Sequence, residues 1–495
     1  KMNLLAMSLV SAAALSFSSC SNNDDLTGGG TQSQADGVYM TLKISGATSH
    51  GTRTSVTDGK TTTDNGSVAE STITEGMMYI YDGPTCVFRK VITKDMFETA
   101  PTQTTSGVTK PIKVAVTGAI TTGKKYDVYF LANRTNVDNP IAATSIFTST
   151  TGGADFATDN KFVMFNQNDG TKAAAHSKVE FTDAAKSDKS PAAADEIKLD
   201  RVVARIDNPS FDESVKTVTP AENTTTSINV ADVVAGISYE GFAVSNLNNN
   251  SYVMQNWDTK FKTLNVKWGE PKYSLPKSDY GTLYNAAGLV NFSSKENPVS
   301  WKYAFENTTT DVNDATAVYF KVKVALTETA NNASDFKDGT FYRYDGRLYT
   351  SIQAIYNDAA TGAISNPFTE TSSITPADVV AKISDADGKL TTDEAKLAQF
   401  RQDYKIEVYR QGVMYYRWAI SDNAYKPFIA SETTHTYSVL RNSIYRLKVT
   451  KVSEIGKDVP NGPEPDDPVK NPNFYMNVTV SINPWVLNAQ PIELK

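Results

Sequence analysis

The sequence predicts a mostly β protein with two β-sandwich-like domains and a few short helices. Thr, Val, Tyr and Phe are plentiful, many short runs alternate apolar with polar residues, and only two segments carry helix signals. The 495 residues are enough for two or three ordinary domains, and a hydrophobic content of 40% is typical of a folded chain. We therefore expect sandwiches whose strands each bury one face.

The predicted elements follow the alternation along the chain. Val38, Met40, Leu42 and Ile44 alternate with polar residues and predict a strand over 38–45. Further strands are predicted over 77–81, 112–116, 126–132, 318–326 and 444–452, a hairpin over 404–420 with its turn at Gln411-Gly412, and helices over 377–383 and 392–400. A polar stretch over 207–227 is the best candidate for a domain boundary, which gives an N-terminal domain over 54–212 and a C-terminal domain over 213–456.

The N-terminal residues resemble a bacterial lipoprotein signal peptide over 1–19. A short basic start, an apolar run over 4–17 and small residues directly before Cys20 are typical of such a segment. Cys20 would then carry the lipid; the alternative is an ordinary signal peptide followed by a chance cysteine. A polar, acidic tract over 21–25 resembles a surface-export signal, and the next eleven residues are typical of a flexible tether.

Composition argues against several classes of function. The net charge is −7 and no long Lys/Arg cluster is present, so nucleic acid is not expected as a partner. Two cysteines, Cys20 and Cys86, cannot build a disulfide framework, and three widely separated histidines do not suggest a zinc site. The sequence contains no phosphate-binding loop, G-x-S-x-G elbow or H-E-x-x-H motif, so we expect no enzyme activity, no catalytic residue and no cofactor. A glycoside hydrolase with a pair of carboxylates stays open as an alternative, because its acidic residues need not be close in the sequence.

An acidic stretch near residue 390 partly matches a calcium-binding loop. Asp385, Asp387, Gly388 and Glu394 fit the pattern, but its first ligand position would be Ile383, which cannot bind a cation. We therefore expect a loop that caps the following helix, and no metal.

The C-terminal segment combines a linker with a patterned strand. Residues 457–473 are rich in Pro and Asp and predict an extended linker. Residues 474–495 begin with an alternating strand whose inward stripe resembles that of residues 38–45. The apolar residues of this segment are Met476, Val478, Val480, Ile482, Trp485, Ile492 and Leu494.

Several of these segments together resemble the type V pilins, or fimbrillins, of Bacteroidales. They are the Cys20 region, Tyr39-Met40-Thr41-Leu42 followed by Arg53, 126–130, 201–205, 413–418, 439–445, and the linker with the strand ending at Pro484-Trp485. Within that family the chain looks most similar to the shaft (major) subunit of the short fimbriae of Porphyromonas. The resemblance implies transthyretin-like β-sandwich domains and a structural subunit that supports adhesion and biofilm formation.

The resemblance also implies a maturation pathway. A lipoprotein precursor reaches the outer membrane, and an arginine-specific protease cuts between Arg53 and Thr54, which removes the propeptide 20–53 with its strand. A strand from residues 474–495 of another copy then fills the vacated groove in an extracellular fimbrium. The implied partners are copies of the chain, anchor and tip subunits, the protease, and host or bacterial surface receptors. From the residues alone, the favoured interpretation of Arg53 is an ordinary arginine in a flexible loop.

Two alternatives remain open from the sequence. A surface glycan-binding lipoprotein would retain residues 20–53 and stay monomeric. An anchor subunit of the same fimbria would keep its N-terminal strand, and a tip subunit would not need a donating C-terminal strand.

Overall fold

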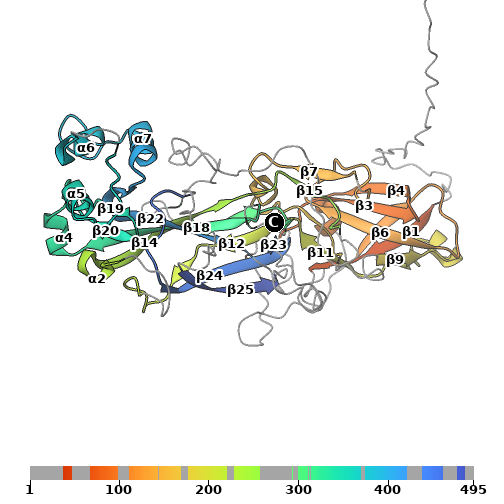
Figure 1. Cartoon of the computed structure of the whole chain (residues 1–495). Coiled ribbons are helices and arrows are strands. Elements are labelled where there is room, and N and C mark those ends of the chain that lie inside the picture. Colours follow the sequence, from red (N-terminus) through yellow and green to blue (C-terminus); the bar gives the residue numbers. More distant parts are fainter. Residues whose placement is uncertain are drawn as a thin grey trace, which may run out of the picture.

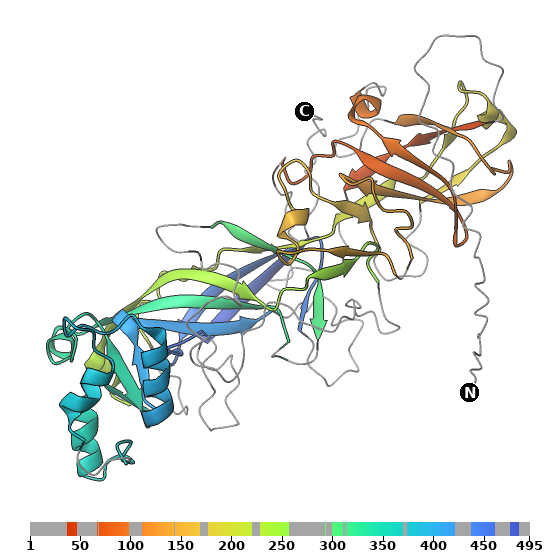
Figure 2. The same cartoon turned by 90° about the horizontal axis from the view of Figure 1, so that it is seen from above.

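The computed structural model describes residues 37–46, 67, 69–98, 111–142, 144–168, 177–219, 228–256, 293, 299–309, 312, 314–369, 374–420, 437–460 and 476–484. Two β-rich domains lie end to end in an elongated molecule, and a group of helices covers the far end of the second domain (Figures 1 and 2). The domain order along the long axis follows the chain, from the orange strands to the green and blue ones. The mostly β fold predicted from the sequence is confirmed.

The N-terminal domain packs two sheets around one apolar core. One sheet has the order β10-β1-β5, and the other has the order β2-β11-β8-β6-β3-β4 with β9 beside β6. Its elements are β1 (Val38–Leu42), β2 (Ile44–Gly46), β3 (Gly76–Asp82), β4 (Thr85–Ile92), α1 (Lys94–Glu98), β5 (Ile112–Val116), β6 (Lys125–Ala132), β7 (Ile146–Thr148), η1 (Ala154–Phe156), β8 (Met164–Asn166), β9 (Ser177–Glu180), η2 (Asp183–Lys186), β10 (Ala192–Ala193) and β11 (Ile197–Arg201).

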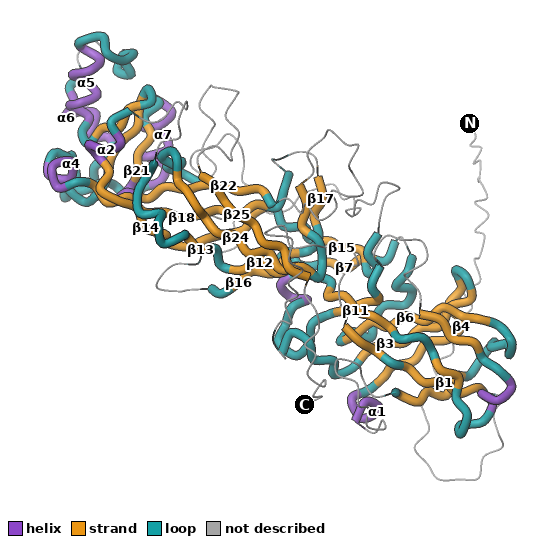
Figure 3. Tube along the Cα trace, turned by 90° about the horizontal axis from the view of Figure 1, so that it is seen from below, coloured by secondary structure: helices purple, strands orange, loops and turns teal. Residues whose placement is uncertain are grey.

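The C-terminal domain contains the sheet β14-β18-β22 and a second sheet in which β24 is a central strand. Its strands are β12 (Ala204–Asp207), β13 (Ser210–Phe211), β14 (Val234–Ser245), β15 (Asn250–Tyr252), β16 (Trp301–Ala304), β17 (Asn307–Thr309), β18 (Ala317–Leu326), β22 (Val413–Ala419), β23 (Tyr437–Val439), β24 (Ser443–Val452) and β25 (Met476–Pro484). Strand β24 has β12 and β13 as parallel neighbours and β25 as its antiparallel neighbour. Figure 3 shows β25 beside β24 in the body of this domain.

The far end of this domain carries helices and a small sheet, which are α2 (Val230–Val233), α4 (Glu328–Asn332), β19 (Phe341–Tyr344), β20 (Arg347–Tyr349), α5 (Ile352–Ala360), α6 (Pro376–Lys382), α7 (Glu394–Tyr404), β21 (Glu407–Tyr409) and η4 (Arg410–Gly412). Residues of α5, α6, α7 and the small sheet form a separate apolar cluster, whereas the buried residues of α2 and α4 belong to the core of the sandwich. Helix α6 begins with a capping box, in which the side chains of Thr375 and Asp378 each accept a hydrogen bond from the backbone N–H group of the other residue. The predicted helices over 377–383 and 392–400 correspond to α6 and α7, whereas α5 was not predicted.

The predicted hairpin over 404–420 is wrong. Its two halves belong to different sheets, because β21 pairs with β19 and β22 pairs with β18. Gln411 and Gly412 do adopt positive φ angles of 49° and 77°, as a hairpin turn would require. A Cβ atom at Gly412 would lie 2.3 Å from the Val324 carbonyl oxygen, so glycine lets the chain cross closely over β18.

The structure also moves two boundaries proposed from the sequence. Strands β12 and β13 fall within the expected N-terminal domain 54–212, yet they pair with β24 and β16 and complete the second sandwich. The expected linker 457–473 begins too early, because Lys457 forms a β-bridge with Tyr415 and Asp458 is buried. Both differences arise because strands pair with segments that are far away in the chain. Local composition cannot predict such long-range pairing.

Candidate functional site

Strand β1 occupies a slot between two strands of the N-terminal domain, and β2 forms the edge of the other sheet. Strand β1 pairs antiparallel with β5 from Val38 opposite Val116 to Leu42 opposite Ile112, and parallel with β10 at its other edge. Strand β2 continues along β11 with Ile44 opposite Ile197. The chain N-terminal to residue 47 therefore satisfies backbone groups on both sides of the slot, which would be open edges without it.

The inward face of this segment is part of the domain core. Val38 is 5% exposed, and Met40, Leu42 and Ile44 are fully buried, as the alternation predicted. They pack in the same cluster as Ile112, Val114 and Val116 of β5. Burial of four such side chains is worth roughly 6–12 kcal/mol in total, at roughly 1.5–3 kcal/mol each.

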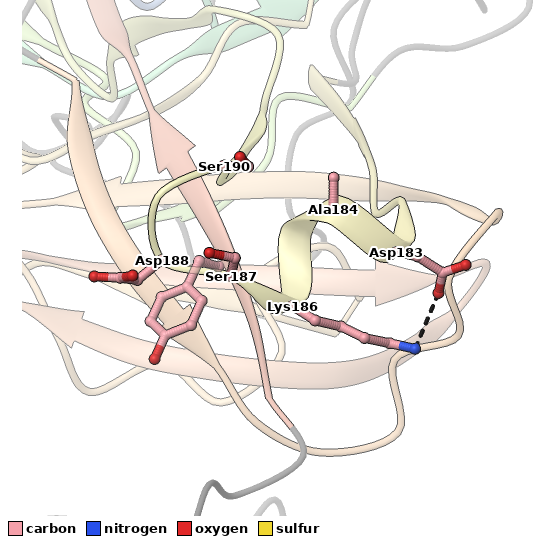
Figure 4. A pocket seen from close by; sticks show the side chains of 7 residues that line it. Asp183, Ala184, Lys186, Ser187, Asp188 and Ser190 are labelled. Carbon is pink, nitrogen blue, oxygen red and sulfur yellow. Dashed lines mark ion pairs between the residues drawn. The ribbon is translucent and has the colours of Figure 1, made fainter.

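The outward face of β1 borders a shallow recess of about 480 Å³. Tyr39 lines it together with residues of η2 and the following turn, which are Asp183, Ala184, Lys186, Ser187, Asp188 and Ser190 (Figure 4). An ion pair of 2.9 Å joins Lys186 Nζ to Asp183 Oδ1, and Thr122 Oγ1 donates to the same carboxylate at 3.0 Å. These hydrogen bonds lower the pKa of the Asp183 carboxyl. Both charges of this pair are exposed to solvent and satisfied by each other.

A buried polar cluster joins the two domains next to this slot. The Glu70 carboxylate, which is 1% exposed, accepts from Arg205 Nη1 at 3.0 and 3.1 Å and from the Tyr303 hydroxyl at 3.0 Å. Arg201, also 1% exposed, donates from Nε to the Glu70 carbonyl at 2.8 Å. Burial lowers the pKa of the Arg201 guanidinium, while Glu70 and Asp200 act in the opposite direction. Glu70 thus forms hydrogen bonds with β11 of the N-terminal domain and with β12 and β16 of the C-terminal domain.

The turn before β24 supplies the second part of this junction. Asn442 has a left-handed φ of 57°, which asparagine tolerates well, and its Nδ2 donates to Asp200 Oδ1 at 2.7 Å. Arg441 Nε donates to Glu306 Oε2 at 2.8 Å, and its Nη1 donates to the Val253 carbonyl at 2.9 Å. Because β15, just before Val253, pairs with β7 of the N-terminal domain, these two consecutive side chains fasten β24 to that domain.

The residues of this junction were not recognised as a site from the sequence. Segments 201–205 and 439–445 contributed to the family resemblance, but neither received a role. Glu70 stands in a polar loop and had no distinguishing signal, because its partners Arg205 and Tyr303 are far away in the chain. Only the spatial arrangement shows that these charges meet.

The C-terminal segment lies along β24 in this structure. Val478 is opposite Val449 and Val480 is opposite Leu447, and the antiparallel register extends from Met476 to Pro484. The sequence analysis placed Met476, Val478, Val480 and Ile482 on a strand, and they do form one. That strand covers an edge of its own chain's sheet, which is the arrangement that a donating strand would have to leave.

The remaining expected site residues lie outside the described residues. They are the lipid site Cys20, the cleavage pair Arg53 and Thr54, and the C-terminal residues Trp485, Ile492 and Leu494.

The acidic loop near residue 390 is structural, as expected. Asp385 accepts from the backbone N–H groups of Asp387 and Lys389 at 2.9 Å each, and Asp393 caps α7. The Glu394 carboxylate pairs with Arg410. Among the described residues, no group of three or more acidic, His or Cys side chains could hold a metal ion, and no helix is long and apolar enough to cross a membrane.

Comparison with family models gives a match in the C-terminal part of the chain. Residues 407–491, from β21 to beyond β25, match the family model for the C-terminal part of the major fimbrial subunit protein type IV, fimbrillin. Among solved structures, a fimbrilin from Porphyromonas gingivalis is 15% identical, with 91% of this chain and 98% of that chain covered and a TM-score of 0.39. A candidate cell adhesion protein from Parabacteroides distasonis is 13% identical, with 92% and 98% covered and a TM-score of 0.41.

The comparison with curated proteins gives no match. The matched residues include strands β21 to β25. This C-terminal part of the chain is therefore similar to the corresponding part of the fimbrillins.

Proposed function

We propose that the chain is the shaft subunit of a surface fimbria, made as a lipoprotein and activated by removal of its N-terminal strand. Lipid attached to Cys20 would hold the precursor at the outer membrane. Cleavage between Arg53 and Thr54 by an arginine-specific protease would free the segment that contains β1 and β2. Copies of the chain would then join by insertion of a C-terminal strand, from residues 474–495 of one copy, into the empty slot of the next.

One observation supports this proposal above the others: the segment before residue 47 fills a two-sided slot with four core side chains. Its loss exposes apolar surface and two sheet edges together, and an extended strand from another chain can cover both. Each subunit would offer one slot and one strand at different places, so the contact is heterologous and extends into an open filament.

The buried polar cluster around Glu70 supports a scheme in which cleavage precedes strand exchange. Glu70 follows the proposed cleavage position along the chain, and its carboxylate and carbonyl are held by residues 201, 205 and 303. None of these contacts involves residues before 54. The new N-terminal region would therefore stay attached at the junction after β1 and β2 leave.

The same slot supports a second role within a fimbria. An anchor subunit would keep β1 in place permanently, as the structure has it, and would not accept another strand. Anchor and tip subunits, and surface receptors, are in either case the partners that a shaft would meet.

The Arg53→Ala variant tests the proposal. The variant should reach the cell surface with its lipid but form no filaments, because β1 continues to occupy the slot. The measurement is electron microscopy of cells together with surface labelling, and Lys60→Ala, in the same loop region, is the matched control that should form filaments. Normal filaments from Arg53→Ala would overturn the cleavage step, and their presence with retained β1 would also exclude strand exchange.

A further inference from the structure

We infer that the incoming strand occupies the slot in the direction and register of β1, with Tyr475 of a second copy of the chain taking the place of Tyr39 in the recess beside η2. The inference rests on the proposed function, and adds to it the register of the exchanged strand and the residue that fixes this register.

The two segments match position by position in the sequence. Residues 38–44 read Val-Tyr-Met-Thr-Leu-Lys-Ile, and residues 474–480 read Phe-Tyr-Met-Asn-Val-Thr-Val. The first, third, fifth and seventh positions are apolar in both, and the intervening positions are Tyr followed by two polar residues in both. Because alternate side chains of a strand face opposite sides, this alignment supplies both faces that β1 now presents.

The outer face of the slot favours one register of the incoming strand along β5 over the others. The recess of about 480 Å³ lies at the level of Tyr39, whose side chain lines it. At the level of Thr41, Lys113 stands opposite on β5, and its Nζ lies 3.4 Å from Asp188 Oδ2 on the turn that leads to β10. Since β1 lies between β5 and β10, this ion pair joins the two sides of the slot. A large residue therefore suits the first level and a short polar residue suits the second.

Most of the recess wall is held by contacts outside β1, and Tyr39 of β1 completes its lining. Ala185 of η2 is fully buried in the domain core, and Gly123 N donates to the Phe181 carbonyl at 2.7 Å. The contacts of Asp183 with Lys186 and Thr122 likewise come from outside β1. Six of the seven lining residues therefore remain in the matured subunit, and an incoming tyrosine would supply the seventh.

The alignment then assigns every partner of the exchanged strand. Tyr475 would face the recess, Met476 would lie opposite Val114, and Asn477 would lie opposite Lys113 in the neighbouring copy, as Tyr39, Met40 and Thr41 now do. A shift by two residues would put Asn477 into the recess and Thr479 opposite Lys113. That arrangement keeps the apolar face inward but leaves the recess without an aromatic side chain.

A disulfide experiment tests the register in the full chain. In a Cys86→Ala background, Asn477→Cys is combined with Lys113→Cys, and the protein is cleaved after Arg53 and allowed to assemble under mild oxidation. Directly opposite residues on paired strands lie within the range that a disulfide can bridge, whereas positions two residues apart along the strand do not. We expect a ladder of covalently linked subunits. The control pair Asn477→Cys with Ala115→Cys, which is also on the outer face of β5, should give no ladder.

A second pair of variants tests the recess itself. Ala184→Phe fills the recess, and Lys189→Phe places the same side chain on the same turn outside its lining. Burial of part of the Tyr475 ring in the recess, worth about 1.4 kcal/mol, corresponds to a filament growth rate lowered about tenfold in Ala184→Phe, with little change in Lys189→Phe.

The possible results separate this inference from the proposed function. Filaments that form without a ladder from the Lys113→Cys pair, or with a ladder from the Ala115→Cys pair instead, overturn the register and leave strand exchange intact. Equal growth of both phenylalanine variants overturns the role of the recess. Failure of the unmodified cleaved protein to assemble at all overturns the proposed function and this inference with it.

Discussion

Truncation of Leu42 should destabilise the precursor and leave the matured chain unchanged. Leu42 is fully buried in the core cluster of the N-terminal domain, on β1. A buried Leu→Ala change costs about 2–5 kcal/mol, because it removes apolar contacts and leaves a cavity. Because the proposed cleavage after Arg53 removes Leu42 together with β1, the substitution should not change the stability of the matured subunit.

Urea unfolding of the precursor and of the cleaved, strand-depleted protein measures both effects. The midpoint for the N-terminal domain should fall in the Leu42→Ala precursor and coincide with that of the unmodified protein after cleavage. Thr41→Ala, whose side chain faces outward, is the matched control and should change the precursor by less than about 0.5 kcal/mol. An equal loss of stability in the cleaved Leu42→Ala protein would refute the reasoning, since it would mean that β1 stays bound.

Three further predictions concern the other parts of the molecule. Glu70→Gln should lower the free energy of unfolding by about 1–3 kcal/mol, because it removes one of the two carboxylates that pair with buried Arg205 and leaves only Asp207, and calorimetry of the precursor, with exposed Glu75→Gln as control, checks this. Val480→Asp should abolish filaments, as seen by electron microscopy. If filaments persist and the monomer instead loses stability, β25 serves only its own sheet, and Ile492 and Leu494 become the donor candidates. Cys20→Ser should abolish labelling by a radioactive fatty acid, and undiminished labelling would remove the lipoprotein step.

Local alternation accounts for the parts of the fold that the sequence predicted well. Strands β5 and β18 coincide with their expected ranges to within one residue, because each buries one face and exposes part of the other. The same pattern identified the buried stripe of β1 before its slot was known. The period of two is a property of neighbouring residues and survives in the sequence without knowledge of the partner strand.

Partner choice accounts for what the sequence did not predict. The turn at Gln411-Gly412 has hairpin geometry, yet β21 and β22 find better partners in separate sheets. The domain boundary fell too late because β12 pairs in parallel with β24, more than two hundred residues away. The charges of Glu70, Arg205 and Arg441 gave no local signal, since a buried ion pair is defined by a residue that is distant in the chain.

The N-terminal residue of the subunit in native filaments tests the central claim most directly. Filaments sheared from cells can be dissolved and the terminal residue determined by mass spectrometry or sequential degradation. Loss of the strand that fills the slot requires cleavage after Arg53, so the account predicts a terminus at Thr54. A subunit that begins at lipid-modified Cys20 and retains residues 38–46 inside an assembled filament would contradict it.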